Sequence, residues 1–325
     1  MSPPGEHRVA VVDSQPGDEP RLAGLSSAVP TDITSGAPGP REIVRRASGA
    51  TVLVTLYTYT AIGAEVLEQL PDVTLVATRT AGYSHIDVAA AARLGIAVAA
   101  VPDAPTTAVT EYTIGVLLMA RRRLAEAASS ARTGAWDFTA FSGGDLAGQT
   151  LGVIGLGRIG RRVAELGSAL GMRVLAWSRR RVEVLGVRHA ELDELLESSD
   201  VVSVNVALND DTRGLPDARR LGHMRPGAWL VNTARGEVLD TDAVCELLRS
   251  GHLGGACLDV VAGEPQRARA LGRVPNLIVT PHISWLSAGT LESQFSGLTD
   301  AVLAFCAGKT IDLVPGGDPM PRRRA

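Results

Sequence analysis

Apolar residues in this chain gather in short, nearly continuous runs that alternate with segments of helical periodicity. In the first hundred residues the pattern predicts strands at 8–13, 51–56, 73–78 and 96–100, and helices at 41–48, 61–70 and 86–94. Residues 14–40 are rich in Pro, Gly and Ser and are expected to form a long loop. Alternating strands and helices of this kind are typical of an α/β unit.

The alternation becomes more regular after residue 150. It predicts strands at 150–154, 173–177, 201–204, 228–232, 255–259 and 277–280, with helices at 158–170, 192–198, 216–222 and 241–250, and a final helix at 288–307. Strands that are apolar at nearly every position indicate parallel sheets covered by helices on both faces. The expected fold class is therefore α/β, with Rossmann-like or flavodoxin-like, doubly wound parallel sheets.

Pro102 and Pro105 interrupt the pattern, and a long apolar helix is expected directly afterwards, at about 107–120. We take this proline pair as a candidate hinge between two domains. A substrate (catalytic) domain is predicted at 1–105 plus 288–325, and an NAD(P)-binding domain at 106–287 is inserted into it.

Composition excludes several classes of protein. With 325 residues, 45% hydrophobic, 21% charged and a net charge of −3, the chain can bury a large core. It matches neither a disordered chain nor a disulfide scaffold, and its charge indicates no nucleic-acid or membrane partner. All but one of the 32 basic residues are arginine, so arginine runs such as Arg322–Arg324 are weak functional signals.

The cysteines and the start of the chain indicate a cytoplasmic location. Cys245, Cys257 and Cys306 are odd in number and show no C-x-x-C spacing, which favours free thiols in a reducing compartment. No apolar secretory segment is apparent near the start, and no apolar run reaches 18 residues. No metal site is expected.

One glycine-rich motif directly follows a predicted strand and opens a predicted helix. The six residues from Gly155 onward are Gly-Leu-Gly-Arg-Ile-Gly, the spacing G-x-G-x-x-G. Gly155 permits the tight turn, Gly157 lets a pyrophosphate approach the backbone, and Gly160 allows the helix to pack closely on the strand. The free N–H groups at the helix start, with Arg158 and Ile159, then face the phosphates. The motif predicts a dinucleotide-binding unit rather than an ordinary strand-to-helix turn.

The end of the next strand selects the dinucleotide. NAD sites usually carry an acidic residue about 20 positions beyond the motif, where it binds the ribose. Here Ser178 stands in that place and is followed by Arg179 and Arg180. A serine hydroxyl can donate to a phosphate, and a guanidinium can bind one bidentately. The missing acid, more than the arginines, favours NADP(H) over NAD(H).

Three polar motifs follow three consecutive predicted strands. They are Asn-Thr-Ala-Arg-Gly with Arg235, Leu-Asp-Val-Val-Ala-Gly-Glu-Pro with Glu264, and Thr-Pro-His with His282. Each residue alone could be an ordinary surface or loop group. Because parallel sheets build their sites at the carboxyl ends of the strands, the three together predict one catalytic group.

Several longer stretches resemble one known family. They are VATRTAGYSHID from Val76, the glycine turn, MRPGAWLVNTARG ending at Gly236, GHLGGACLD ending at Asp259 and PNLIVTPH ending at His282. Over about residues 52–308 the chain resembles the D-isomer-specific 2-hydroxyacid dehydrogenases. The sequences of its motifs are most similar to those of the D-lactate dehydrogenase branch, including the vancomycin-resistance type. The resemblance implies an oxidoreductase that transfers a hydride between NAD(P)H and a 2-oxo acid or D-2-hydroxy acid.

The resemblance also implies a role for each catalytic group. Arg235 would bind the substrate carboxylate and polarise the adjacent ketone. His282, protonated in the reducing direction, would give its proton to the developing alkoxide. Glu264 would hydrogen-bond the other imidazole nitrogen, fix its tautomer and raise its pKa.

Further contacts follow from the same resemblance. Backbone N–H groups of Ala81 and Gly82, on the first domain, would complete the carboxylate site across a cleft. Besides the turn and the residues from Ser178 to Arg180, the cofactor would be lined by Val206, Ala207, Thr212, Thr233, Ala234, Arg235, Asp259 (near the nicotinamide carboxamide) and His282. A homodimer formed through about residues 107–138 is expected.

The chain departs from the family at several positions near the expected site. Ala207 stands where a proline is usual, and Trp285 brings a large aromatic residue towards the cleft. Tyr57 and Tyr59 are candidates for the facing wall, although all three aromatic residues are equally well interpreted as packing residues. A larger 2-oxo acid or a phosphonate analogue therefore fits as well as D-lactate does.

Two alternatives remain beside an NADPH-preferring 2-oxo acid reductase. The corepressors of the C-terminal-binding type share the fold and all three motifs, although nothing in the sequence suggests the nuclear signal or long regulatory tail expected of one. Phosphite dehydrogenases keep the same arginine, glutamate and histidine. Formate dehydrogenases place glutamine beside the histidine, so Glu264 counts against that activity.

Overall fold

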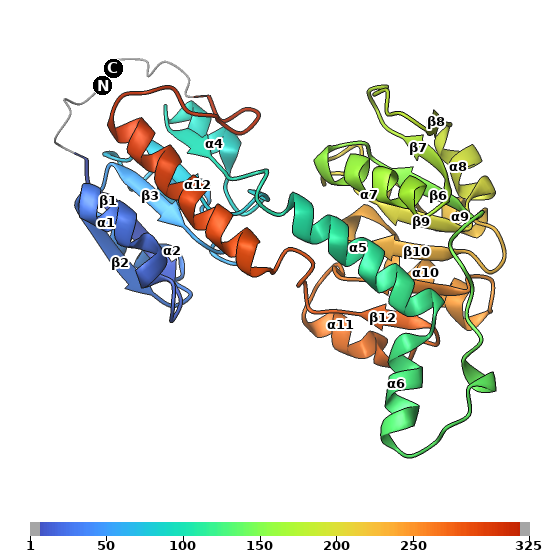
Figure 1. Cartoon of the computed structure of the whole chain (residues 1–325). Helices are drawn as coiled ribbons and strands as arrows, with labels where there is room; N and C mark the ends of the chain where they lie inside the picture. The colour runs from blue at the N-terminus through green and yellow to red at the C-terminus, as the bar shows by residue number, and fades with distance from the viewer. Residues whose placement is uncertain (1–6, 319–325) are drawn as a thin grey trace. The chain divides into compact units, whose positions relative to one another are not determined.

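The computed structural model describes residues 7–318, and the chain divides into two compact units. Unit 1 combines the residues up to Pro105 with those from Ser287 onward, and unit 2 runs from Thr106 to Leu286. Each unit holds one parallel sheet with helices on both faces (Figure 1). The predicted fold class is confirmed. The arginine run at 322–324 lies outside the described residues.

The sheet of unit 1 has five parallel strands in the order β2-β1-β3-β4-β5. They are β1 (Val9–Ser14), β2 (Thr31–Ser35), β3 (Val52–Thr55), β4 (Leu75–Thr78) and β5 (Ala97–Ala99). Its helices are η1 (Glu19–Leu22), α1 (Ala23–Ala28), α2 (Pro40–Ala47), α3 (Ala64–Leu67), α4 (Val88–Arg93) and α12 (Ala288–Cys306). One face of the sheet packs against α2, α3 and α4, and the other against η1, α1 and α12.

The expected long loop at 14–40 is wrong, because it contains η1, α1 and β2. Leu22 and Leu25 are fully buried, so two short helices form despite the surrounding glycine and proline. Strand β2 lies at the edge of the sheet and is only partly buried along its length, so it shows no apolar run. Helix α3 is a single turn, much shorter than the predicted 61–70.

The sheet of unit 2 has seven parallel strands in the order β12-β11-β10-β9-β6-β7-β8. They are β6 (Thr150–Ile154), β7 (Arg173–Trp177), β8 (Val187–His189), β9 (Val201–Val204), β10 (Trp229–Asn232), β11 (Gly255–Leu258) and β12 (Leu277–Val279). The order reverses at β6, where β7 lies on one side and β9 on the other. Such a reversal opens a crevice at the carboxyl ends of the strands.

Helices cover both faces of this sheet (Figure 1). They are α5 (Thr106–Arg121), α6 (Leu124–Arg132), η2 (Thr139–Phe141), α7 (Arg158–Ala169), α8 (Leu192–Ser198), α9 (Ala218–Gly222), η3 (Gly236–Val238), α10 (Thr241–Arg249), α11 (Gln266–Ala270) and η4 (Leu271–Arg273). One face packs against α5 and α7, and the other against α8, α9 and α10. Within residues 7–318, no helix combines the length and apolar character needed to cross a membrane.

Candidate active site

The glycine turn after β6 lies at the point where the strand order reverses. Gly155 has a φ of +99°, a conformation that favours glycine, and its N–H donates to the carbonyl of Trp177 over 2.7 Å. A Cβ at Gly155 would lie 2.8 Å from the carbonyl oxygen of Asn205 and from a methyl group of Val206, just after β9. The turn is therefore pressed against the end of the neighbouring strand.

Gly157 and Gly160 differ in their surroundings. A Cβ at Gly157, the residue that precedes α7, would meet no protein atom within 4 Å. A Cβ at Gly160 would overlap with the carbonyl oxygen of Gly155. Since the first N–H groups of α7 lack acceptors within the helix, the open space at Gly157 gives an anion direct access to them. These residues fit a dinucleotide pyrophosphate.

The residues after β7 form an exposed, charged loop. The hydroxyl of Ser178 donates to the carbonyl of Arg180 over 2.6 Å. The guanidinium of Arg179 pairs with the carboxylate of Asp211 at 2.7 Å, and both side chains are more than half exposed (67% and 69%). Arg180 forms no ion pair with any residue between 7 and 318. Two of the three residues predicted to bind a phosphate thus already have partners in the chain.

The loop that supplies Asp211 is closed by one buried hydroxyl. Thr212 donates to the carbonyl of Ala207 over 2.6 Å and accepts from the N–H of Asn209 over 2.9 Å. Val206 is partly buried and Ala207 exposed, at the carboxyl end of β9. This places the predicted cofactor residues of the loop at the same edge of the sheet as the glycine turn.

Arg235 is held by the fold of its own loop. The side chain of Asn232, at the end of β10, donates to the carbonyl of Arg235 and accepts from the N–H of Ala234. A Cβ at Gly236 would overlap with the backbone of Val261, so only glycine lets this loop lie against the one that carries Glu264. The sequence offered no signal for Asn232 beyond its position at a strand end.

His282 and Glu264 form a hydrogen-bonded pair. The imidazole Nδ1 lies 2.8 Å from Oε1 of Glu264, and the two side chains are 36% and 34% exposed. The other carboxylate oxygen of Glu264 accepts from the N–H of Val261 over 3.0 Å. Burial raises the pKa of Glu264, but the hydrogen bonds from His282 and Val261 and the charges of His282 and Arg235 outweigh it, so the pKa is lowered.

The Arg235 guanidinium belongs to the same electrostatic group. Burial lowers its pKa, and the charges of Glu237 and Glu264 oppose that effect. One of its nitrogens donates to the carbonyl of Ala234 over 2.7 Å. Arginine stays protonated under such shifts, so the structure brings a permanent cation, a carboxylate and an imidazole together at neighbouring strand ends.

Asp259 was expected near the nicotinamide carboxamide, and in the structure its carboxylate holds the loop around His282. It accepts hydrogen bonds from the hydroxyl of Thr280 and from the N–H groups of Ile283 and Ser284. Asp259 is 2% exposed, so these bonds are shielded from water. Thr233, another predicted cofactor residue, is hydrogen-bonded through its hydroxyl to that of Thr113 in α5 at 3.2 Å.

In unit 1, Ala81 and Gly82 follow β4. The hydroxyl of Thr80 donates to the carbonyl of Gly82 over 2.7 Å and fixes the shape of the loop. Neither the N–H of Ala81 nor that of Gly82 has an acceptor within residues 7–318. Two adjacent backbone donors are therefore available to an anion.

Tyr57 lies in the same unit, but its hydroxyl donates to the carboxylate of Asp18 over 3.0 Å. Its ring stacks on Tyr59, with centroids 5.1 Å apart, and the guanidinium of buried Arg79 lies 4.5 Å from its centre. Burial, with the hydrogen bond to Asp18, raises the pKa of Tyr57 to about 12. These contacts fit a packing role for Tyr57, and Trp285, in unit 2, is partly buried.

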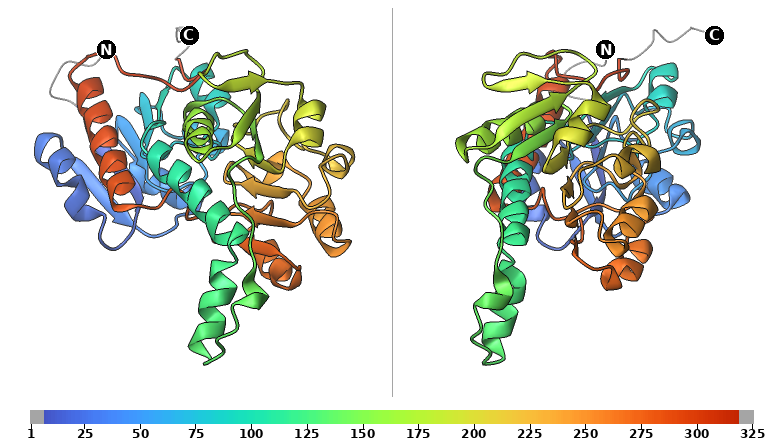
Figure 2. Two further views of the ribbon diagram at one scale, coloured as in Figure 1. Left: turned by 45° about the vertical axis from the view of Figure 1, so that its right-hand side comes forward. Right: turned by 90° about the vertical axis from the view of Figure 1, so that its right-hand side faces the viewer.

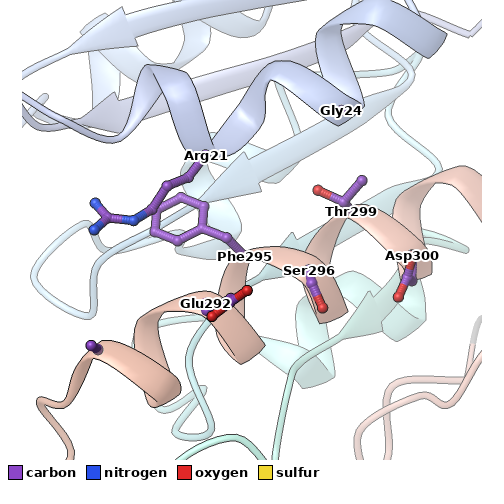
Figure 3. Close-up of a pocket in the computed structure, with 8 residues that line it drawn as sticks. Arg21, Gly24, Glu292, Phe295, Ser296, Thr299 and Asp300 are labelled. Atoms are coloured by element: carbon purple, nitrogen blue, oxygen red, sulfur yellow. The ribbon is translucent and has the colours of Figure 1, made fainter.

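A surface pocket of about 490 Å³ lies elsewhere in unit 1, between α1 and α12 (Figure 3). Its walls include Arg21, Phe295 and Thr299, and none of the predicted site residues lines it. The candidate active site is therefore the group at the strand ends of unit 2, and not this pocket. No cluster of three His, Cys, Asp or Glu suited to a metal ion occurs in the part of the chain that the structure describes.

Comparison with known proteins gives consistent matches. Residues 114–284 match the model of the D-isomer specific 2-hydroxyacid dehydrogenase NAD-binding domain. A glycerate dehydrogenase of Methylorubrum extorquens is 36% identical over 85% of this chain and 88% of its own, and a glyoxylate reductase of Aeropyrum pernix is 37% identical over 84% and 85%. The D-lactate dehydrogenase of Aquifex aeolicus, solved with NAD and lactic acid, superposes with a TM-score of 0.83 at 29% identity, covering 92% and 96%.

The two glycines of the turn should respond differently to an added methyl group. Gly160→Ala forces a Cβ onto the carbonyl of Gly155 and should destabilise the fold by about 1–3 kcal/mol, the usual cost of overpacking. Gly157→Ala adds its methyl group in open space and serves as the control. Thermal denaturation of both variants tests this, and equal melting temperatures would contradict the packing described for Gly160.

Proposed function

Because the chain belongs to the family of D-isomer specific 2-hydroxyacid dehydrogenases, we propose that it reduces a small 2-oxo acid to a D-2-hydroxy acid with NADPH. It is an NAD(P)-dependent oxidoreductase acting on CH–OH donors. The observation that carries the proposal is the group formed by Arg235, Glu264 and His282 on the sheet that also bears the glycine turn. Glyoxylate is the first substrate to test, since related proteins are named glyoxylate reductase and glycerate dehydrogenase.

The chemistry that a bound nicotinamide supplies is hydride transfer to the keto carbon. The glycine turn would hold the pyrophosphate, with Arg158 and Ile159 at the helix start. Val206, Ala207, Thr212, Thr233, Ala234 and Asp259 would line the remainder of the dinucleotide site. Arg235 would bind the substrate carboxylate with its planar fork and polarise the ketone beside it. Following the family resemblance, we also propose that the N–H groups of Ala81 and Gly82, which have no acceptor within residues 7–318, bind the substrate carboxylate.

His282 would be the proton donor. Because the ionised carboxylate of Glu264 can only accept, Nδ1 of the imidazole must carry a hydrogen in the observed bond. The second nitrogen, Nε2, is then the one that gives a proton to the keto oxygen when the imidazole is protonated. Glu264 would therefore orient the ring and fix which nitrogen faces the substrate.

Two substitutions separate the roles of the catalytic group. His282→Ala should lower kcat for 2-oxo acid reduction by about 10²–10⁴-fold, the usual contribution of a general acid. Arg235→Ala should lower kcat/KM by about 10²–10³-fold, mainly through KM for the acid, because a carboxylate partner is lost. Steady-state kinetics with NADPH and a panel of 2-oxo acids measures these changes. A separate assay with phosphite and NADP⁺ tests the alternative activity.

The matched control is His223→Ala. His223, just after α9, also pairs with a glutamate, Glu197 in α8, at 3.1 Å, but both side chains are exposed. The control should keep the wild-type rate, and dinucleotide binding should persist in all three variants. A His282→Ala enzyme with near-normal kcat/KM would refute the assigned proton donor.

The preference for NADPH is proposed from Ser178, Arg179 and Arg180. No carboxylate stands in the position that usually binds the ribose of NAD. Arg179 is held by Asp211 through an exposed ion pair, and such pairs contribute about 0–1 kcal/mol. The doubly charged 2′-phosphate of NADPH can therefore displace the carboxylate of Asp211 and bind the Arg179 guanidinium in its place.

The double substitution Ser178→Asp with Arg179→Ala should shift the ratio of kcat/KM for NADPH to that for NADH by at least about tenfold towards NADH. The new carboxylate repels the 2′-phosphate, and one charge-assisted contact of about 1.5–3 kcal/mol is removed. Arg181→Ala is the control, because Arg181 in the same loop pairs with Glu183. An unchanged ratio would show that the arginines only reflect composition.

We also propose that two chains associate through the arm formed by residues 122–142. Helix α6 buries no residue, and Trp136 and Phe138 are 89% and 86% exposed. In both Figure 1 and Figure 2 this arm extends away from the sheet of unit 2. Apolar side chains gathered on one exposed segment are typical of an interaction surface.

Sedimentation velocity should therefore show a dimer for the wild type, and a monomer for Trp136→Ser with Phe138→Ser. The two substitutions remove the two most exposed large apolar side chains of the arm, Trp136 and Phe138. Leu185→Ser, at a fully exposed residue outside the arm, is the control and should stay dimeric. A monomeric wild type would overturn this assembly.

A further inference from the structure

The backbone at His282 adopts a conformation that few non-glycine residues use. Its φ is +56°, in the left-handed region where a Cβ is crowded by the neighbouring peptide. Such a conformation is strained for a residue with a Cβ, and it persists only when surrounding contacts hold it. The contacts that hold His282 therefore determine where its imidazole lies.

Asp259 provides most of these contacts. Its backbone carbonyl accepts from the N–H of His282 over 3.0 Å. Its carboxylate accepts from the next two N–H groups, those of Ile283 at 2.9 Å and Ser284 at 2.8 Å. Three successive backbone donors thus converge on one buried aspartate, and the orientation of its carboxylate sets the course of the loop.

The carboxylate is in turn oriented by Thr280, and Thr280 by Tyr112. The Thr280 hydroxyl donates to Oδ1 of Asp259 over 2.7 Å. It also lies 2.5 Å from the hydroxyl of Tyr112, on α5. Since Thr280 has a single hydroxyl hydrogen and gives it to the carboxylate, Tyr112 must be the donor in the second bond. The direction of the chain is therefore fixed from Tyr112 through Thr280 to Asp259.

We propose that Tyr112 is a positioning residue for the reaction of His282, acting through Thr280 and Asp259. The inference rests on the proposed function, because His282 is the proton donor there. Tyr112 is well suited to this task, since its ring is partly buried against the apolar cluster between α5 and the sheet. A rigid aromatic ring presents its hydroxyl from a fixed place, 168 residues away in sequence from the threonine it contacts.

Loss of the Tyr112 hydroxyl should weaken this arrangement without emptying the site. Thr280 would lose the hydrogen bond that Tyr112 donates to it and could rotate away from Asp259. The loop after His282 would then hold the left-handed backbone of His282 less firmly. The imidazole would spend less time hydrogen-bonded to Glu264. The turnover step should suffer, whereas dinucleotide binding at the glycine turn should not.

The experiment compares Tyr112→Phe with Thr110→Val. Thr110 is buried in the same helix, and among residues 7–318 its hydroxyl bonds only to the carbonyl of Thr106, so it controls for the loss of a buried hydroxyl. Tyr112→Phe should lower kcat about fivefold or more, as expected for one hydrogen bond, with the KM for NADPH unchanged. Thr110→Val should leave both values as they are.

A second measurement does not depend on activity. Amide hydrogen exchange at Ile283 and Ser284 should be faster in Tyr112→Phe and unchanged in Thr110→Val. Thr280→Val should reproduce the loss, Thr280→Ser should retain the wild-type behaviour, and adding Tyr112→Phe to Thr280→Val should cause no further change.

The outcomes separate the two hypotheses. If the wild type reduces 2-oxo acids while Tyr112→Phe shows wild-type kcat and wild-type exchange, the positioning role is wrong and the proposed function stands. If the wild type reduces no 2-oxo acid, the proposed function fails, and the exchange data alone decide whether Tyr112 holds the loop. If Tyr112→Phe does not fold, the comparison of Thr280→Val with Thr280→Ser decides: equal kcat and equal exchange in these two variants would overturn the proposal.

Discussion

The parallel direction of every strand in unit 2 is the constraint on which the site depends. Because all seven strands end at one edge, residues separated by more than a hundred positions in sequence become neighbours there. The glycine turn, the Arg235 loop, the Glu264 loop and His282 all follow strand ends. Close glycine contacts then bring the loops together, at Gly155 against Asn205 and at Gly236 against Val261.

Electrostatic balance explains why these groups can share a partly buried edge. A buried guanidinium, carboxylate or imidazole is unfavourable alone, but each has a compensating partner here. Burial raises the pKa of Glu264, but the hydrogen bonds from His282 and Val261 and the charges of His282 and Arg235 lower it by more. An ionised carboxylate can only accept a hydrogen bond, so Glu264 holds the imidazole with a hydrogen on Nδ1. Polar groups are also paired next to His282, where Asp259 accepts hydrogen bonds from three backbone N–H groups.

Much of this arrangement could be predicted from the sequence, and the exceptions have physical causes. Central strands such as β6 and β9 are buried at every position, so the sequence pattern predicts their ends to the residue. The edge strand β2 has no such run, and η1 and α1 lie in a Pro- and Gly-rich stretch. The catalytic motifs were found because they directly follow strands. The contacts of Arg179 with Asp211 and of Tyr112 with Thr280 join distant side chains of common types, which no local pattern reveals. The preference for NADPH stays a prediction.

The most direct test of the account is a crystal structure of the protein with NADPH and oxamate, an unreactive analogue of a 2-oxo acid. We expect the oxamate carboxylate on the guanidinium of Arg235, the amide carbonyl oxygen within hydrogen-bonding distance of Nε2 of His282, and the nicotinamide C4 facing the carbon between them. An analogue bound away from Arg235, or an imidazole turned from the analogue while still paired with Glu264, would contradict the proposed reaction.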